Sequence, residues 1–470
     1  MKTARYSKRS AHAGMTASDD VIKRPVTNKM LWLFAIGQFG WSLLSGVITN
    51  WLVFFYQPSE ENINSGQTLF VTQGAVFLGL TVIGLITAAC RIFDAVTDPW
   101  VASLSDRCSS RLGRRIPFLR TAAIPFAVVT VLVFCAPVDK ISGWNTVFLL
   151  IMLLLFYLFL TMYCTPFNAL IPELGKTQKD RINVSTYISF TFFMGTGIAY
   201  LLPNVAKLFQ PELGYVGSLR MTIAIFAAVA LAAMLVPAFA LKEPEFADIT
   251  PSDTPGIKSL IKTFGNKDFQ TFVGSDILYW IALTIFQTGL PFYITVLMKL
   301  DTGMSFVLFA LMTVMSLVFY VPVNLLAKKI GKKKLISFAF LFFSFVFLIT
   351  TFAGCSGFTG IKAEIVISVL ASVPMAILGI LPQAVVADIA QADAAETHEN
   401  REGMFYAART FAFKLGQSAA MLLFTALAGI GTNGFGYRVT AVVAAVLCFA
   451  GGIVFLKYRE DKVTDMISKG

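Results

Sequence analysis

Residues 91–99 read RIFDAVTDP and lie inside a long apolar segment of this chain. Two carboxylates, Asp94 and Asp98, are four residues apart in this stretch. An ionisable side chain costs about 2.5–3.5 kcal/mol to insert at the centre of a membrane helix, so such residues usually mark an ion or substrate path. The stretch therefore predicts a membrane helix with a cation site, as in a secondary transporter.

The composition is that of a membrane protein. Of the 470 residues, 56% are hydrophobic and only 14% are charged, whereas an average soluble domain has about 25% charged residues. The apolar residues come in runs of about 20, the length that crosses a bilayer as a helix. A β-barrel would show short alternating segments instead. We therefore expect an all-α polytopic membrane protein.

Twelve apolar segments can be counted, and a polar stretch with three prolines divides them into two groups of six. This layout resembles the major facilitator fold, in which two six-helix halves face each other. The first group covers residues 30–56, 74–104, 116–136, 145–171, 184–208 and 220–241, and the second covers 270–297, 303–327, 335–354, 363–389, 404–430 and 437–457. The expected domains are a tail at 1–29, an N-terminal half at 30–241, a linker at 242–269, a C-terminal half at 270–457 and a tail at 458–470.

The net charge of +11 is concentrated in short stretches between the apolar segments. Lys and Arg cluster in residues 1–29, 107–115 and 328–334. Cytoplasmic loops of membrane proteins carry such an excess of basic residues. We therefore expect a multi-pass protein of the plasma (inner) membrane, a monomer in the lipid bilayer, with both termini and the linker cytoplasmic. The distribution gives no support to a nucleic-acid partner.

The metal-binding and nucleophilic residue types form no recognisable motif. The two histidines are far apart, and the six cysteines show no Cys-x-x-Cys spacing. We expect no metal centre, no cofactor and no enzymatic activity. Unpaired thiols are the favoured interpretation, with a Cys135–Cys355 pair as the alternative.

The candidate cation site is rich in oxygen atoms. Asp94 and Asp98 share one helix face, about 6 Å apart along the axis. Thr97 adds a hydroxyl, and Pro99 disrupts a hydrogen bond in the helix backbone. Such a site suits Na⁺ or Li⁺, or the two carboxylates share one proton. The structural alternative is an ion pair between one aspartate and Arg91, one turn away.

Three further charged residues of the apolar segments are candidates for the site: Lys414, Arg409 and Asp276. Lys414 is more than two turns inside the eleventh segment, too deep to reach the interface easily. We expect it to face the central cavity and to balance Asp94 and Asp98 when no cation is bound, or else to pair locally with a carbonyl or water. Arg409 lies in the same segment, and Asp276 lies in the seventh, where structural and functional pairing are equally plausible.

The loop after the second segment predicts a gate. Asp106 and Arg107 end that segment, and Arg114 and Arg115 precede the next one. Charge-assisted contacts among such residues can close the cytoplasmic side in one state and break in the other.

Several motifs resemble those of one known family. They are Asp94-x-x-x-Asp98-Pro99, Asp106-Arg107, Gly113-Arg114-Arg115-x-Pro117, Ala387-Asp388, Arg401-Glu402-Gly403 and Phe413-Lys414-Leu415-Gly416, together with Arg181 after the fourth segment. The chain resembles the glycoside–pentoside–hexuronide cation symporters of the major facilitator superfamily, which include the melibiose permease. Residues 105–111 are also similar to a loop of the plant sucrose–proton symporters.

The resemblance implies roles for individual residues. Asp94 and Asp98 would bind the coupling ion, Na⁺ or H⁺, with Thr97 and Thr161 nearby and Lys414 facing both sites. Positions that hold the sugar in the melibiose permease fall here on Ser42, Cys164 and Asn168, so the galactoside part of the pattern is not kept. Further candidates for substrate binding are Gln38, Trp41, Tyr187 and Arg409. The gate would comprise Asp106, Arg107, Arg114, Arg115, Arg181, Asp388 and Arg401, and Arg91 would join Lys414 in coupling.

The sequence thus predicts a secondary active transporter for cation-coupled symport of a sugar or glycoside by alternating access. The alternative is a cation-coupled transporter of another solute, such as a lysolipid, a nucleoside or a drug, on the same fold.

Overall fold

Long helices account for most of the chain. The structure is a computed structural model that describes residues 26–77, 79–175, 178–247, 261–355, 357–397 and 402–469. The long helices of the first half are α1 (Asn28–Tyr56), α3 (Val82–Asp106), α4 (Ile116–Val133), α5 (Gly143–Ala169), α7 (Gln178–Tyr200) and α8 (Leu202–Ala240). Those of the second half are α10 (Lys267–Phe292), α11 (Met304–Ile330), α12 (Lys332–Thr351), α13 (Gly360–Thr397), α14 (Glu402–Ala428) and α15 (Phe435–Phe455).

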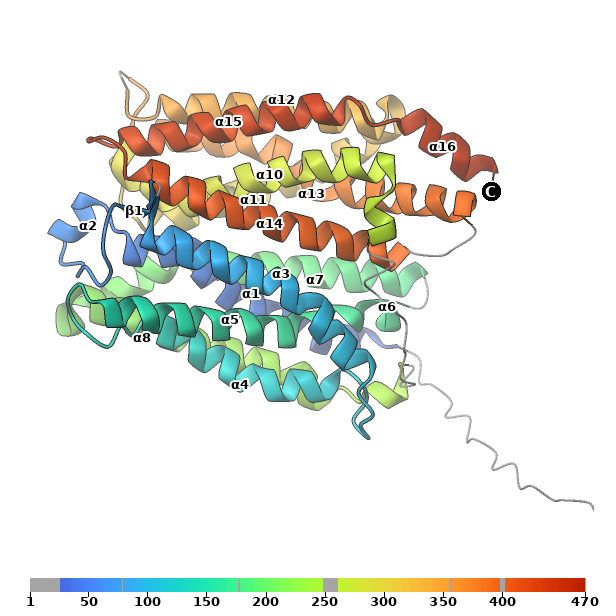
Figure 1. Ribbon diagram of the computed structural model, residues 1–470, viewed down its shortest axis with the longest axis horizontal. Coiled ribbons are helices and arrows are strands. Elements are labelled where there is room, and N and C mark those ends of the chain that lie inside the picture. Colours follow the sequence, from blue (N-terminus) through green and yellow to red (C-terminus); the bar gives the residue numbers. More distant parts are fainter. Residues whose placement is uncertain are drawn as a thin grey trace, which may run out of the picture.

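The short elements lie at the two ends of these helices. They are α2 (Glu60–Asn64), strands β1 (Ala75–Phe77) and β2 (Leu80–Thr81), α6 (Ile171–Leu174), the 3₁₀ turn η1 (Glu243–Glu245), the π-helical turn η2 (Tyr293–Leu297) and α16 (Glu460–Lys469). We call the end with α2 and the β1–β2 hairpin the hairpin end, and the opposite end, with α6 and α16, the linker end (Figure 1).

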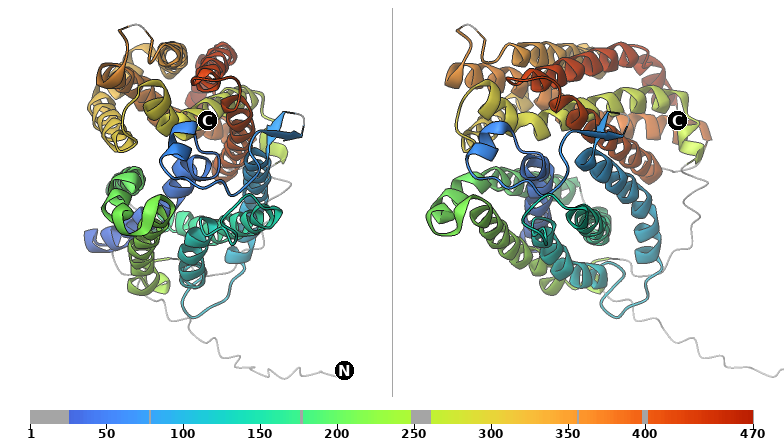
Figure 2. Two further views of the ribbon diagram at one scale, coloured as in Figure 1. Left: turned by 90° about the vertical axis from the view of Figure 1, so that its left-hand side faces the viewer. Right: turned by 60° about the vertical axis from the view of Figure 1, so that its left-hand side comes forward.

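The long helices form two bundles that follow each other in sequence. Figure 1 shows α1 to α8 in the lower bundle and α10 to α15 in the upper one, with the helices running between the two ends. The views in Figure 2 show the same two groups of helices. Across the boundary, α3 packs on α14 and α1 packs on α10. The expected all-α fold of two six-helix halves is confirmed.

Within the described residues, nine segments are long and apolar enough to cross a membrane. One of them, Asn183–Ala240, combines most of α7 with α8. Helix α3 is absent from the nine because Arg91, Asp94 and Asp98 lie in its middle. Large apolar side chains such as Phe239 face outward, which suits contact with lipid. The chain is a multi-pass integral membrane protein.

Several helix boundaries differ from the sequence expectation, and two of the differences depend on glycines. A helix was expected from residue 74, but α3 begins only at Val82, where Thr81 caps it by accepting a hydrogen bond from the Gly84 N–H (3.1 Å). Gly74 and Gly79 have φ of 78° and 80°, a region that glycine adopts without strain, and β1 and β2 form between Gly74 and Thr81. In α8, Gly214 has a φ of 67° and separates two helical segments.

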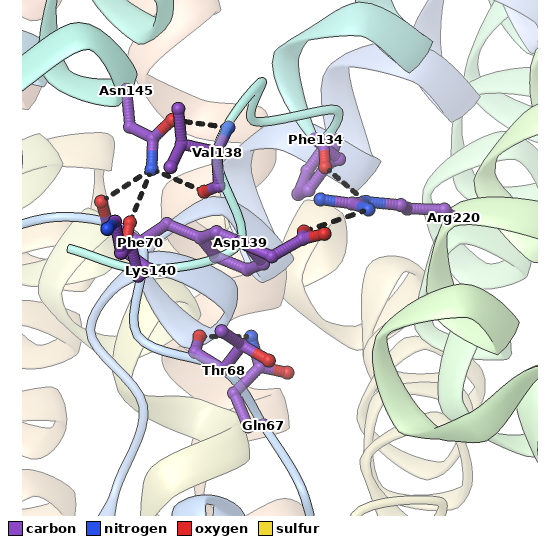
Figure 3. Close-up of polar contacts among 9 residues, drawn as sticks. All are labelled: Gln67, Thr68, Phe70, Phe134, Val138, Asp139, Lys140, Asn145 and Arg220. Carbon is purple, nitrogen blue, oxygen red and sulfur yellow. Dashed lines mark hydrogen bonds and ion pairs between the residues drawn. The ribbon is translucent and has the colours of Figure 1, made fainter. Parts of the chain in front are cut away.

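Polar contacts stabilise the loops of the N-terminal half at the hairpin end (Figure 3). The fully buried Asn145 donates to the carbonyls of Phe70, Val138 and Lys140 at 2.8–2.9 Å, and accepts from the Val138 N–H at 3.0 Å. Arg220 of α8 donates to the carbonyl of Phe134 at 2.9 Å. These buried loop groups therefore find partners within the protein, as buried polar groups require.

The two halves repeat one helix cap at the linker end. Glu243, just after α8, accepts hydrogen bonds from the N–H groups of Arg115 (2.7 Å) and Ile116 (3.0 Å) at the start of α4. Glu460, just after α15, accepts hydrogen bonds from the first two N–H groups of α12 at 2.7 and 3.0 Å. N–H groups in the first turn of a helix have no partner within the helix, and a carboxylate there also favours the helix dipole.

A glycine precedes each cap. Gly113 and Gly331 have φ of 107° and 88°, and a Cβ at these positions would come within 2.3 Å of Glu243 and 2.9 Å of Glu460. The residues that follow are Arg114-Arg115 in one half and Lys332-Lys333 in the other. The same turn and cap therefore precede the third helix of each half.

We expect Glu243→Ala and Glu460→Ala each to lower the free energy of unfolding by about 1–2 kcal/mol, because each leaves two N–H groups of a helix start without an acceptor. The measurement is the midpoint of thermal unfolding in detergent. Glu212→Ala, at an exposed position of α8, is the control. A shift for the two caps no larger than for the control would contradict the assignment.

Candidate functional site

Two carboxylates of α3 and one ammonium group of α14 meet between the halves. The Nζ of Lys414 lies 2.9 Å from Oδ2 of Asp94 and 2.6 Å from Oδ2 of Asp98. Asp94 is fully buried, whereas the side chain of Asp98 keeps 21% of its exposed area. Because Asp98 lies one turn nearer the linker end, the site is more open toward that end. The structure thus brings together the three charged residues that the sequence singled out.

Hydroxyl groups complete the surroundings of the carboxylates. Thr161 of α5 donates to Oδ1 of Asp94 at 2.8 Å. Thr97 donates to the backbone carbonyl of Asp94 at 3.1 Å, so its hydroxyl bonds to its own helix. The other carboxylate, Asp98, accepts at Oδ1 from Thr165 at 3.1 Å. Sequence reasoning missed Thr165, although its spacing of four residues from Thr161 repeats that of the two aspartates.

Arg91 contacts α1 and α5. Its Nη2 lies 3.5 Å from the hydroxyl of Thr49, and its guanidinium group stands 5.0 Å from the centre of the Tyr157 ring. The expected alternative of an Arg91–aspartate ion pair is not the arrangement seen, because Lys414 occupies the space between the two carboxylates.

A second buried ion pair joins α10 and α14 inside the C-terminal half. Arg409 donates to Asp276 through Nε (2.7 Å) and Nη2 (3.0 Å), and its guanidinium lies 5.6 Å from the ring centre of Phe272. Both charged side chains are less than a tenth exposed. A bidentate arginine–carboxylate pair is a strong, directional contact, so the charge of Arg409 is already compensated.

The other candidates for substrate binding are distributed over α1, α5 and α7. Ser42 donates to the carbonyl of Phe39 (3.1 Å), and Tyr187 stacks on Trp32 with 4.3 Å between ring centres. Gln38 is buried, Cys164 is partly buried, and Asn168 is exposed.

Two indole groups are buried without a hydrogen-bond acceptor. They belong to Trp41 of α1 and Trp280 of α10, the first long helices of the two halves. A buried donor without a partner is costly. Each of these N–H groups therefore lacks an acceptor among the described residues.

Four ion pairs between described residues at the linker end each lie within one half. Arg115 contacts both Ser105 and Asp106, and Arg114 lies 3.8 Å from Glu173. In the C-terminal half, Lys332 pairs with Asp388, and Arg459 with Asp268 at 2.8 Å. Arg107 ends α3. Two of the expected gate residues are not covered, since Arg401 and the side chain of Arg181 lie outside the described part of the chain.

At the hairpin end, one short turn of the C-terminal half forms ion pairs with the N-terminal half at two points. Lys299 pairs with Glu61 of α2, and Asp301 pairs with Lys207 of α8. Lys299 has a φ of 56°, in the left-handed region. Burial raises the pKa of Asp301, but hydrogen bonds from Lys207 and the Gly303 N–H outweigh it and hold the pKa below its usual range. We call these two pairs the hairpin-end clamp.

Uncharged contacts next to the clamp also join the halves. The rings of Phe54 and Phe292 have centres 5.4 Å apart, and Gln57 donates to the carbonyl of Thr425 at 3.1 Å. The hairpin end is therefore held closed by contacts between the halves.

Two bundles of six apolar helices, with a buried charge cluster between them, define a membrane transporter of the major facilitator type. The chain belongs to the family described as MFS/sugar transport protein, whose model matches residues 33–450.

The individual relatives have low sequence identity with this chain. The isoprimeverose transporter of Lactiplantibacillus pentosus is 22% identical over 304 residues, which are 64% of this chain and 59% of that protein. The inner membrane symporter YicJ of Escherichia coli (strain K12) is 25% identical over 221 residues, 45% of this chain and 46% of that protein. The chain thus spans about half the length of these curated relatives. The crystal structure of a D-xylose-proton symporter aligns with a TM-score of 0.65 at 16% identity, over 93% of this chain and 98% of that one, a likeness of fold.

Proposed function

We propose that this protein is a secondary active transporter that couples the inward movement of Na⁺ or H⁺ to that of a sugar or glycoside. The observation that carries the proposal is the ammonium group of Lys414 between Asp94 and Asp98. Two carboxylates buried beside one ammonium group form a site that a cation can enter by displacing the lysine. Because the lysine comes from the other half, filling the site changes the contact between the halves.

The arrangement of contacts corresponds to one state of alternating access. The hairpin-end clamp joins the two halves, whereas the ion pairs of Arg115 and Lys332 at the linker end lie within one half. Asp98, on the linker-end side of the site, is the more exposed carboxylate. From the contacts between the halves at the hairpin end, we infer a state in which ion and substrate leave the site toward the linker end.

The charges favour an uncharged substrate. Arg409, the arginine that could hold an anionic solute, is paired with Asp276. The indole N–H groups of Trp41 and Trp280, which have no acceptor among the described residues, can donate to hydroxyl oxygens. One relative is named an isoprimeverose transporter, which supports a sugar or glycoside as the class of substrate.

We also propose the plasma (inner) membrane as the location, with both termini cytoplasmic and the transporter acting as a monomer. The orientation is supported by the concentration of Lys and Arg at 107–115 and 328–334, at the linker end, and the location by a relative that is named an inner membrane symporter. On this orientation, the hairpin end faces outward.

The test is uptake of radiolabelled sugars and glycosides into inside-negative membrane vesicles that contain the protein. Each substrate is measured with no ion gradient, with an inward Na⁺ gradient and with an inward proton gradient. Accumulation above equilibrium with one of the gradients supports symport. Equilibration without accumulation for every substrate, in vesicles that bind the solute, would show a uniporter instead.

A charge-swap experiment tests the hairpin-end clamp. We expect Lys299→Glu to shift the protein toward the outward-open state by about 1.4- to 5-fold, because an exposed ion pair contributes about 0.2–1 kcal/mol. Glu61→Lys should do the same, and the double variant should restore the wild-type distribution. The measurement is labelling of Phe54→Cys by an impermeant maleimide from outside, in low salt. A double variant that labels as fast as the single ones would contradict the clamp.

A further inference from the structure

Two similar hydrogen bonds join α5 to α3. We call the pair of bonds the ladder and each bond a rung. Thr161 donates to Oδ1 of Asp94, and Thr165 donates to Oδ1 of Asp98. Because the aspartates and the threonines are each four residues apart, the rungs are separated by one helical turn. Thr97 bonds to a backbone carbonyl. The second hydroxyl at the carboxylates is therefore that of Thr165, a residue to which the family resemblance assigns no role.

The two ladder threonines differ from several buried threonines of the long helices. Thr87, Thr130 and Thr222 each donate to the backbone carbonyl four residues earlier, at 2.8–2.9 Å, which is a common partner of threonine within a helix. The hydroxyls of Thr161 and Thr165 are instead directed across to α3. Both side chains thus present oxygen atoms at the charged site.

The carboxylates keep binding capacity on the side of Lys414. Oδ2 of Asp94 and Oδ2 of Asp98 both face the ammonium group of Lys414, at 2.9 and 2.6 Å, and no other side chain is recorded against these two oxygens in the described part of the chain. A cation that displaces the ammonium would therefore meet one oxygen of each carboxylate. The hydroxyl oxygens also remain usable, since a threonine that donates its proton to a carboxylate retains its lone pairs.

A metal ion and a proton differ in the number of oxygen ligands that each one takes. A proton binds to a single carboxylate oxygen, whereas hard metal cations take several oxygen ligands at once. The two hydroxyls of the ladder add oxygens that only a metal ion can use.

We propose that Thr165 selects the coupling ion: its hydroxyl oxygen completes a site for a monovalent metal cation, Na⁺ or Li⁺, and favours that ion over a proton. The inference rests on the proposed symport, and it specifies which ion drives it. Since Asp98 is the more exposed carboxylate, the Thr165 rung is also the last one that the ion leaves on its way to the linker end.

The experiment compares wild type, Thr165→Val, which keeps the shape without the hydroxyl, and Thr165→Ser, which keeps the hydroxyl. Thr130→Val is the matched control, because Thr130 is a buried threonine of α4 bonded to its own helix. The first readout is the Na⁺ concentration for half-maximal sugar uptake, set beside uptake driven by a proton gradient in Na⁺-free medium. The second is the rise in the thermal unfolding midpoint of the purified protein on adding NaCl instead of choline chloride, which needs no sugar.

We expect Thr165→Val to raise the half-maximal Na⁺ concentration about tenfold, the loss expected for one bond to a charged group, and to reduce the Na⁺-induced rise in midpoint. Proton-driven uptake should remain unchanged, Thr165→Ser should behave as wild type, and Thr130→Val should change neither readout.

Three outcomes would overturn the inference. The first is an unchanged Na⁺ response in Thr165→Val. The second is an equal loss of Na⁺-driven and proton-driven uptake in that variant, which would indicate a structural role. The third is a wild type whose midpoint and uptake respond to neither Na⁺ nor Li⁺; if that protein still accumulates sugar with a proton gradient, symport stands and only ion selection by Thr165 fails.

Discussion

Replacing Asp94 with asparagine should abolish cation-driven accumulation of the substrate. In the wild type, two carboxylates face one ammonium group, and the excess negative charge attracts the ion. In Asp94→Asn, Asp98 and Lys414 neutralise each other, so a cation gains nothing by displacing the lysine. The neutral amide cannot balance the charge of a bound monovalent cation in this buried site, so we expect the cation affinity to fall by at least about a hundredfold, which is about 2.8 kcal/mol. Asp98→Asn should act in the same way.

Folding should survive these substitutions, because the remaining carboxylate still pairs with Lys414. The measurement is concentrative uptake with an ion gradient, compared with downhill equilibration without one. Glu364→Gln is a matched control, since Glu364 is a buried carboxylic acid of α13 whose side-chain oxygens have no hydrogen-bond partner. Wild-type accumulation with unchanged ion dependence in either aspartate variant would show that the ion binds elsewhere.

Removing the ammonium group should uncouple ion from substrate. In Lys414→Ala the two carboxylates no longer hold a side chain of the other half, so cation binding changes nothing between the halves. By linkage, ion and substrate must raise each other's affinity by the same factor, typically about 5- to 150-fold. We expect this factor to fall toward one in Lys414→Ala, with a smaller change in substrate affinity itself.

The measurement is the dissociation constant of the substrate with no Na⁺ and with saturating Na⁺, or at two pH values if the ion is H⁺. Lys362→Ala, at an exposed position in the first turn of α13, serves as the control. A ratio of the two constants that stays at its wild-type value would place Lys414 outside the coupling path.

The fold follows from the sequence because few structures satisfy the backbone hydrogen-bonding groups of a long apolar segment in lipid. Backbone groups in lipid must be bonded within a helix, so the length and number of the apolar segments predict the twelve long helices. The buried charges could be found for the same reason, since Asp94, Asp98 and Lys414 are conspicuous among apolar neighbours. That Lys414 lies between the aspartates depends on how the two halves pack, yet its depth in the segment already indicated a role at the centre.

Other features depend on contacts that a linear pattern does not show. The β1–β2 hairpin replaces a stretch that is apolar enough for a helix, because two glycines adopt positive φ there. A threonine in a helix usually bonds to its own backbone, so only the structure distinguishes Thr165 from Thr130. The sequence left Arg409 as a candidate for substrate binding. In the structure its charge is compensated by Asp276.

The caps formed by Glu243 and Glu460 have a mechanical consequence. Each ties the exit of a half's sixth helix to the entry of its third, so that segments about 130 residues apart in the chain resist being pulled away from each other. We therefore expect each half to move as a rigid body that rotates about a point near the charge cluster. A small displacement where the ion binds would be transmitted along the full length of the helices, and the hairpin end would separate as the linker end comes together.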